Sequence, residues 1–142
     1  MKSLKDTLVT KTLLTVQSGA DIYDVVCFMA QHNIGLVPVL SNDGKLMGVF
    51  SERDLVRRVI AKGLDLKATP VDDIMTKELI LADVSESYEQ CLQKMKDRGI
   101  RHILIIENEK LAGILSIKDL LEMDIKVQRE TIEVLHNYIY SK

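Results

Sequence analysis

The chain lacks tryptophan, and its 142 residues include only two phenylalanines and four tyrosines. Proteins that bind single-stranded nucleic acid stack the bases on aromatic side chains, and this chain has few aromatic side chains. The formal net charge is -2 and the pI is about 5.9. Because no overall positive field would attract phosphates, the composition argues against a nucleic-acid partner.

Long hydrophobic runs are also missing. No uninterrupted apolar stretch approaches the ~18 residues that a membrane-spanning helix requires. The N-terminal residues MKSLKDTLVTK carry charges where a signal peptide needs an apolar run. We therefore expect a cytoplasmic protein with no membrane partner.

Cysteine is scarce, with one residue at Cys27 and one at Cys91. Each lies inside an apolar helical pattern, and neither has a histidine or another cysteine at metal-ligand spacing. Both are predicted to be buried free thiols in a reducing compartment, and no metal site is expected.

The chain repeats itself. The segment Met29–Ile34 matches Met95–Ile100, and the apolar run Leu36–Leu40 then falls on the run 102–106. After a one-residue deletion in the following turn, Lys45–Leu55 lies over Lys110–Leu120, with Lys, Leu, Gly, Ser, Asp and Leu recurring in register. Such self-similarity predicts two copies of one structural unit.

Each copy has the pattern β-α-β-β-α. Apolar spacing predicts a helix after each first strand, with Ser18 and Ser85 as N-caps, and Asn33 and Gly99 as left-handed stops. The remaining elements are strands and final helices. The predicted strands are 13–16, 36–40 and 46–50 in the first copy and 79–82 with a tighter hairpin around 107–109 in the second, and the final helices are 52–61 and 116–140.

The boundaries follow from these elements. Residues 1–63 form the first repeat with its N-terminal segment, 64–73 a linker, 74–123 the second repeat and 124–142 a C-terminal helical extension. Neither copy has enough apolar surface to close a core alone. We expect an α/β (α+β) fold of tandem repeats related by a pseudo-twofold axis.

One motif stands at a strand-to-helix junction in both copies. The segments Gly48–Asp54 and Gly113–Asp119 both read G-h-x-S-x-(R/K)-D, where h is apolar. The glycine would let a ligand approach the backbone, and the serine begins a helix whose free N–H groups suit a phosphate. The aspartate can accept two hydrogen bonds from a vicinal diol. Together they suit a ribose phosphate.

The same spacing has a structural interpretation. Ser-x-x-Asp resembles a capping box, in which the serine caps the helix and the acid reaches back. That motif favours Glu or Gln, because Asp is one methylene shorter, and it requires no cation between the two residues. The recurrence of the whole set in both copies favours the ligand interpretation.

The ordered motifs resemble the CBS-domain pair, also called the Bateman module. The resemblance spans about residues 9–123 and rests on the two motifs above, on Ile34–Val39, on Gly99–Ile105 and on the joint Val71–Thr76. It implies two three-stranded sheets, two clefts between the copies, binding of AMP, ATP, ADP, NAD or S-adenosylmethionine, and dimerisation.

The resemblance also implies roles for residues. Two aspartates, Asp54 and Asp119, would hold ribose hydroxyls. The serines and basic side chains that would lie near phosphates are Ser51, Ser116, Arg53, Lys118, Arg101 and His102. The residues that would border the base, from the segments at the first strands and from the central strands, are Thr12, Leu13, Glu78, Leu79, Val37, Pro38, Ile103 and Leu104.

The copies differ at several of these positions, since Arg53 corresponds to Lys118 and Pro38 to Leu104. Gly35 and Leu36 stand where the second copy has Arg101 and His102, so one tighter site is expected. His102 has an alternative interpretation as a core histidine.

These features predict a regulatory module that binds an adenine nucleotide, AMP first, and signals in trans to a protein effector. The alternative is a structural dimerisation module with empty clefts. Enzyme activity and a catalytic cofactor are not expected, because no nucleophile–base pair, carboxylate dyad or metal cluster is visible. The apolar stripe along 118–140 predicts a homodimer, with this helix packed on a partner subunit or laid across its own module.

Overall fold

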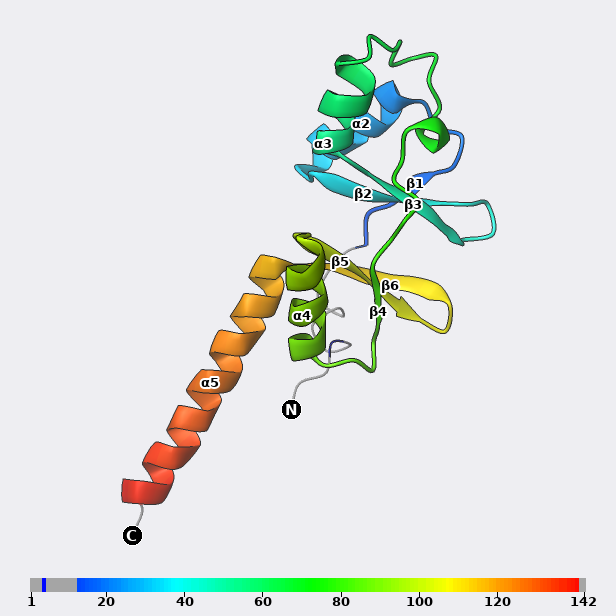
Figure 1. Ribbon diagram of the computed structural model, residues 1–142. Helices are drawn as coiled ribbons and strands as arrows, with labels where there is room; N and C mark the ends of the chain where they lie inside the picture. Colours follow the sequence, from blue (N-terminus) through cyan, green and yellow to red (C-terminus); the bar gives the residue numbers. More distant parts are fainter. Residues whose placement is uncertain (1–3, 5–12, 141–142) are drawn as a thin grey trace. The chain divides into compact units, whose positions relative to one another are not determined.

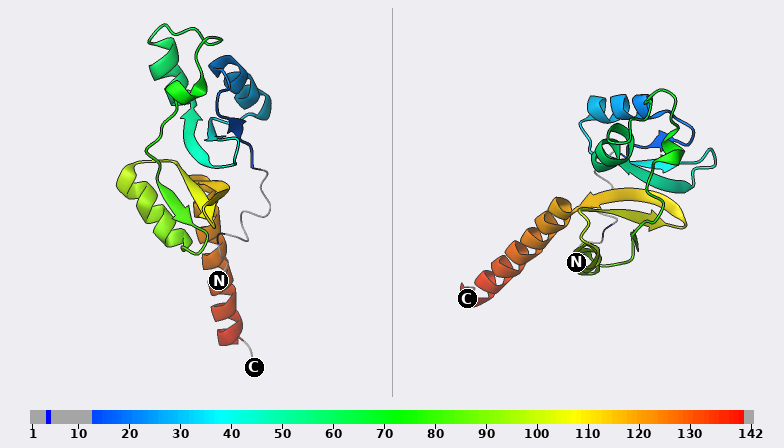
Figure 2. Two further views of the ribbon diagram at one scale, coloured as in Figure 1. Left: turned by 90° about the vertical axis from the view of Figure 1, so that its right-hand side faces the viewer. Right: turned by 45° about the horizontal axis from the view of Figure 1, so that its top comes forward.

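The computed structural model describes Leu4 and residues 13–140 (Figure 1, Figure 2). The chain divides into two compact units, with the main boundary between Leu79 and Ile80. Each unit contains a three-stranded sheet, of order β1-β2-β3 in the first and β4-β5-β6 in the second. The predicted duplication and mixed α and β architecture are therefore confirmed.

The first sheet comprises β1 (Val16–Gln17), β2 (Leu36–Leu40) and β3 (Leu46–Ser51). Strand β1 runs parallel to β2, and β2 runs antiparallel to β3 with Val37 opposite Phe50. Strand β1 is shorter than predicted and begins later, since only two of its residues pair with β2. Both Val37 and Phe50 are fully buried and form the core with helix α2 (Ile22–His32).

The N-cap of helix α2 is Asp21, so the predicted N-cap at Ser18 is wrong. The Asp21 carboxylate accepts from the Asp24 N–H at 2.8 Å, whereas the Ser18 hydroxyl donates to Asp72 in the linker. At the other end, Asn33 has φ 54°, which confirms the left-handed stop.

The final helix of the first unit has two parts, α3 (Glu52–Asp54) and the π-helical η1 (Leu55–Ile60). The Ala61 N–H donates to the Val56 carbonyl, five residues back, at 3.0 Å. The predicted helix is therefore present, but most of it is π-helical rather than α-helical, a difference that apolar spacing does not reveal.

Residues 64–79, which follow η1 and end at the unit boundary, contribute an additional paired segment to this unit, and this stretch is called the linker from here on. After the 3-10 helix η2 (Val71–Asp73), Thr76 exchanges two backbone hydrogen bonds with Val49 of β3, at 2.8 and 3.0 Å. A Cβ on Gly48 would lie 2.8 Å from the Thr76 carbonyl oxygen and 2.9 Å from Met75. Gly48 therefore admits the chain's own linker, which corrects its interpretation as a point of ligand approach.

The second sheet comprises β4 (Leu81–Asp83), β5 (His102–Glu107) and β6 (Lys110–Ser116). Helix α4 (Tyr88–Arg98) has Ser87 as its N-cap rather than the predicted Ser85, and its C-cap is Gly99 with φ 64°, as predicted. The β5–β6 turn is a two-residue one, in which Asn108 and Glu109 both have positive φ.

Helix α5 (Ile117–Tyr140) confirms the predicted long final helix. Its first turns pack on α4 in the second core, where Leu120 is fully buried. Leu4 is buried in the same core. The helix then continues past α4 in every view (Figure 1, Figure 2).

The cysteines differ from one another. Cys91 is fully buried in the second core, as predicted, and burial raises the pKa of its thiol to about 11. Cys27 is exposed, which makes the prediction of a buried thiol there wrong. The buried residues of α2 are Ile22, Val25 and Met29, and position 27 lies off that face.

Candidate functional site

The Ser51 turn forms a complete capping box. The Asp54 N–H donates to the Ser51 hydroxyl at 3.2 Å, and the Ser51 N–H donates back to Asp54 Oδ2 at 3.0 Å. The Ser51 hydroxyl lies 3.1 Å from the same oxygen. The aspartate is thus long enough to make the return bond, which corrects the view that it is one methylene too short.

The second unit repeats this arrangement. The Asp119 N–H donates to the Ser116 hydroxyl at 3.1 Å, and the Ser116 N–H donates to Asp119 Oδ2 at 2.8 Å. The backbone before each motif is also equivalent, because Glu52 N–H donates to Gly35 and Ile117 N–H donates to Arg101, at 3.0 and 2.9 Å. The repeated motif is therefore a repeated local structure, with a capping role in both copies.

Asp54 has further neighbours. It is 7% exposed, the one charged residue classed as buried among residues 13–140. Its second oxygen, Oδ1, lies 3.5 Å from the Thr76 hydroxyl and 3.7 Å from Arg58 Nε. Arg58 is held in turn by a 2.9 Å bond from Nη1 to the Ile74 carbonyl. One carboxylate oxygen thus caps the helix, while the other faces a hydroxyl and a cation.

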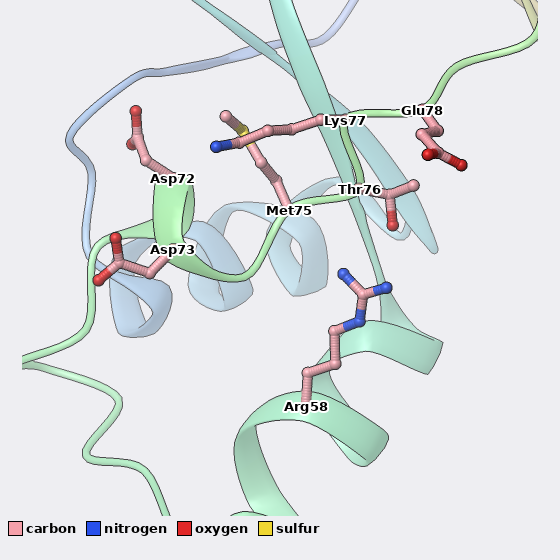
Figure 3. A pocket seen from close by; sticks show the side chains of 7 residues that line it. All are labelled: Arg58, Asp72, Asp73, Met75, Thr76, Lys77 and Glu78. Atoms are coloured by element: carbon pink, nitrogen blue, oxygen red, sulfur yellow. The ribbon is translucent and has the colours of Figure 1, made fainter.

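An open cavity of about 640 Å³ adjoins these groups, within the first unit. Figure 3 shows Arg58 reaching from the helix toward Thr76 on the linker. The lining mixes both signs of charge with a single apolar side chain. The lining residues are Arg58, Asp72, Asp73, Met75, Thr76, Lys77 and Glu78.

Of the residues predicted for a site, Glu78 lines this cavity. Arg58 and Thr76 were not predicted. Arg58 follows Asp54 by four residues on a helix, a spacing that brings side chains together and could have indicated it. Thr76 is separated from Asp54 by 22 residues, and only pairing of the linker with β3 brings it there.

The remaining predicted residues of the first unit differ in their exposure. Val37 and Pro38 are buried in β2. Arg53 is exposed beside Asp54, whereas Leu13 is 38% exposed and Leu79 is half-buried. Thr12 lies outside the described residues.

In the second unit the predicted polar residues gather near one turn. Ser116 and Asp119 are half-buried, while Arg101 and Lys118 are exposed. His102 is exposed at the start of β5, so its alternative interpretation as a core histidine is wrong. The following residues, Ile103 and Leu104, belong to the strand's buried part.

The described residues contain neither a metal cluster nor a membrane-spanning helix. Within residues 13–140, no three His, Cys, Asp or Glu side chains gather where they could hold a metal ion. In the same part of the chain, no helix combines the length and apolar character needed to cross a bilayer.

Comparison with known proteins identifies relatives of this architecture. The CBS domain protein YhcV of Bacillus subtilis is 36% identical over 120 residues, which cover 84% of each chain. The mitochondrial CBS domain protein CBSX3 of Arabidopsis thaliana is 36% identical over 122 residues, or 83% of this chain. The match spans 59% of that relative's own length.

A solved structure shares the fold at comparable coverage. The CBS domain protein of Pyrobaculum aerophilum, whose structure is complexed with AMP, is 27% identical with a TM-score of 0.74. The match covers 83% of this chain and 89% of that one. The CBS domain model matches the sequence twice, at residues 4–61 and 71–126. The chain therefore belongs to the CBS-domain family and carries two copies of the domain.

Proposed function

We propose that this chain is a cytoplasmic regulatory module that binds an adenine nucleotide and acts in trans, as a homodimer, on a partner protein. AMP is the first candidate, ahead of ATP, ADP and NAD. Support comes from the AMP complex of the Pyrobaculum relative, which matches across both repeats. It also comes from the duplicated Ser-x-x-Asp turn, which places a carboxylate and a hydroxyl alike in each unit.

The observation that carries the proposal is that the two carboxylate oxygens of Asp54 have different neighbours. An ionised carboxylate has two oxygens and about four acceptor positions. The capping box uses Oδ2, and Oδ1 faces Thr76 and Arg58 at the longer distances of 3.5 and 3.7 Å. The carboxylate therefore retains acceptor capacity for a ribose diol while it caps the helix.

Phosphate groups would be met by cations. Arg58 and Lys77 line the cavity next to Asp54, and Arg101 and Lys118 lie near the corresponding turn of the second unit. Charge-assisted hydrogen bonds to phosphate are about twice as strong as neutral ones. A nucleotide offers the ribose and phosphate that these two sets of groups would recognise.

A second candidate function, the structural dimerisation module, is favoured by one specific observation. Both Ser-x-x-Asp pairs are engaged in capping, so neither pair requires a ligand to account for its presence. Under this alternative the aspartates contribute to stability only.

The two candidates separate on Asp119→Ala. We expect the substitution to weaken AMP binding by about 1.5–3 kcal/mol, the range for hydrogen bonds to a charged group. Isothermal calorimetry measures the affinity, and thermal unfolding measures the loss of the cap, expected at about 1 kcal/mol.

Ser116→Ala is the matched control, because it removes the cap of the same helix and leaves the carboxylate. If both variants melt earlier and both bind AMP like the original chain, Asp119 is a cap alone and the structural alternative holds. A thermal-shift series with AMP, ADP, ATP, NAD and S-adenosylmethionine ranks the ligands, since binding to the native state raises the melting midpoint.

A further inference from the structure

Helix α5 exposes an apolar seam that runs from Leu121 to Ile139 and is interrupted once, by Gln128. Its positions are spaced four and three residues apart in alternation, the heptad pattern of a coiled coil. Four of the apolar side chains in it are about half exposed or more: Ile125 49%, Ile132 64%, Leu135 55% and Ile139 69%. The whole seam is Leu121, Ile125, Gln128, Ile132, Leu135 and Ile139.

The seam begins on a face that both repeats share. In the repeat alignment Val56 and Ile60 correspond to Leu121 and Ile125, and they are also exposed, at 61% and 57%. In the first unit the helix ends at Ile60, so that face stops there. In the second unit α5 carries the same face onward to Ile139.

Several occupants could cover this seam, and the charges disfavour a lipid surface. Helices that lie on membranes carry a polar face rich in lysine and arginine. Helix α5 has three basic residues against five acidic ones, so it would be repelled by anionic lipids.

The residue types favour a second copy of this helix. In the heptad lettered a to g, positions 125, 132 and 139 are a positions, and all three are isoleucine. Positions 121, 128 and 135 are d positions, and two of these three are leucine. Ile at a with Leu at d favours parallel two-stranded coiled coils, and a single polar core residue fixes the register. Gln128 is that residue; within one chain its amide donates to Asp124 at 3.3 Å.

The flanking charges agree with a parallel pair. Asp124 occupies a g position and Arg129 the following e position, so in a parallel dimer Arg129 of each copy approaches Asp124 of the other. Asp124 is already fixed on its own unit, because the Tyr88 hydroxyl donates to it at 3.1 Å. Tyr138 borders the seam at the next-but-one g position and is 83% exposed.

We propose that α5 forms a parallel, in-register, two-stranded coiled coil with α5 of a second copy of this chain. The seam from Leu121 to Ile139 spans 19 residues, about 28 Å of helix. Short isolated helices are marginal in water because their first turn is costly to form. Here Leu120 and Asp124 hold the first turns on α4, so the helix is nucleated before it meets its partner.

Light scattering at micromolar concentration tests the seam. The intact chain should give a particle of twice 16.1 kDa, and Ile132→Asp should weaken self-association at least about a hundredfold, because it would bury a charge. The matched control is Asn137→Asp, which adds the same charge at an f position on the opposite face. It should remain a dimer. Circular dichroism should give the same melting of the two units in both variants at concentrations where both are monomeric.

Disulfide trapping tests the orientation. In a Cys27→Ser background, Ile139→Cys should cross-link readily between copies, since identical seam positions face one another in a parallel pair. Asn137→Cys, on the outer face, should cross-link at least about tenfold more slowly. Equal rates for the two cysteines would overturn the parallel seam.

This inference rests on the homodimer in the proposed function and is independent of the nucleotide. The AMP affinity of Ile132→Asp distinguishes the coiled coil from the nucleotide site. If this variant no longer dimerises but still binds AMP, the result supports the seam alone. A dimer that survives Ile132→Asp unchanged overturns the seam and leaves the homodimer standing. A monomeric intact chain overturns both.

Discussion

The two units contain the same turn in different surroundings. In each, a serine and an aspartate three residues later close a capping box at the end of the third strand. In the first unit the aspartate is buried beside Thr76 and Arg58. In the second, the aspartate is half-buried, and exposed Arg101 and Lys118 lie on the adjoining segments.

The two copies thus share the local turn and differ in the residues that surround it. The capping box needs only residues close in sequence, so both copies retain it. The surroundings depend on distant segments, and these have diverged: the linker covers β3 of the first unit, and the long helix α5 extends the second. The same local turn therefore lies in different surroundings in the two units.

The largest expected difference between the units concerns their thiols. Burial raises the pKa of Cys91 to about 11, so its reactive thiolate form is scarce at pH 8, whereas Cys27 is exposed on α2. Because thiolates are the reactive species, we expect Cys27 to react with a disulfide reagent at least about a hundredfold faster than Cys91. The reaction should stop at one thiol per native chain and reach two in denaturant. Cys27→Ser should abolish the fast phase, and a fast phase that persists would show that the second core opens readily.

A second prediction tests the linker, which pairs with the third strand of the first unit. Gly48→Ala places a Cβ 2.8 Å from the Thr76 carbonyl oxygen, and a backbone atom cannot move away freely. We expect a loss of about 1–3 kcal/mol in the free energy of unfolding, measured by urea titration.

Gly35→Ala is the matched control in the same unit. Its Cβ would meet the Glu52 carboxyl group at 3.3 Å, the far end of an exposed and flexible side chain. It should change stability by less than about 0.5 kcal/mol. Equal losses in the two variants would mean that the linker does not hold Gly48 so closely.

A third prediction uses acid to loosen the same linker. The Ser18 hydroxyl and the Gly19 N–H, the latter at 2.6 Å, donate to Asp72 and lower its pKa against the opposing effect of partial burial. A pKa that is lower in the folded state than in the unfolded state increases the free energy of unfolding. This contribution is complete at pH values above 3.8, the pKa of the unfolded state, and is lost as the pH falls through the pKa of the folded state.

Asp72→Asn should therefore cost about 1 kcal/mol at pH 7 and progressively less below pH 4. Urea titrations at several pH values measure this difference. Asp73→Asn, at the exposed neighbouring position, is the control and should leave the pH profile unchanged. A constant cost for Asp72→Asn at all pH values would mean that its charge is not what ties the linker to the β1–α2 loop.

Local sequence accounts for the parts of the fold that were predicted correctly. Asn33 and Gly99 were identifiable as helix stops, because few residue types adopt positive φ. The hairpins and the length of α5 likewise follow from short-range patterns. The N-caps show the limit of this reasoning, since Ser18 bonds to Asp72, a residue 54 positions away.

The candidate site shows the same limit. The Ser-x-x-Asp pairs were visible as a motif, but their capping geometry required coordinates, because a side-chain length alone misjudged the reach of aspartate. Thr76 and Gly48 meet only because the linker pairs with β3. No local pattern encodes that pairing.

The smallest expected effect concerns the inequality of the two sites. Arg101 corresponds to Gly35, so at this position the second unit has a guanidinium and the first has no side chain. Its backbone carbonyl accepts from Ile117, and that bond is independent of the side chain, so Arg101→Ala should leave the fold intact. Exposed charge pairs contribute up to about 1 kcal/mol, so AMP affinity should fall about fivefold. Adenosine affinity should not change, because adenosine lacks the phosphate that the guanidinium would bind, and Arg101→Lys should be intermediate. Calorimetry with both ligands decides the matter: equal losses for AMP and adenosine, or two identical AMP sites in the intact chain, would show that Arg101 does not distinguish the units.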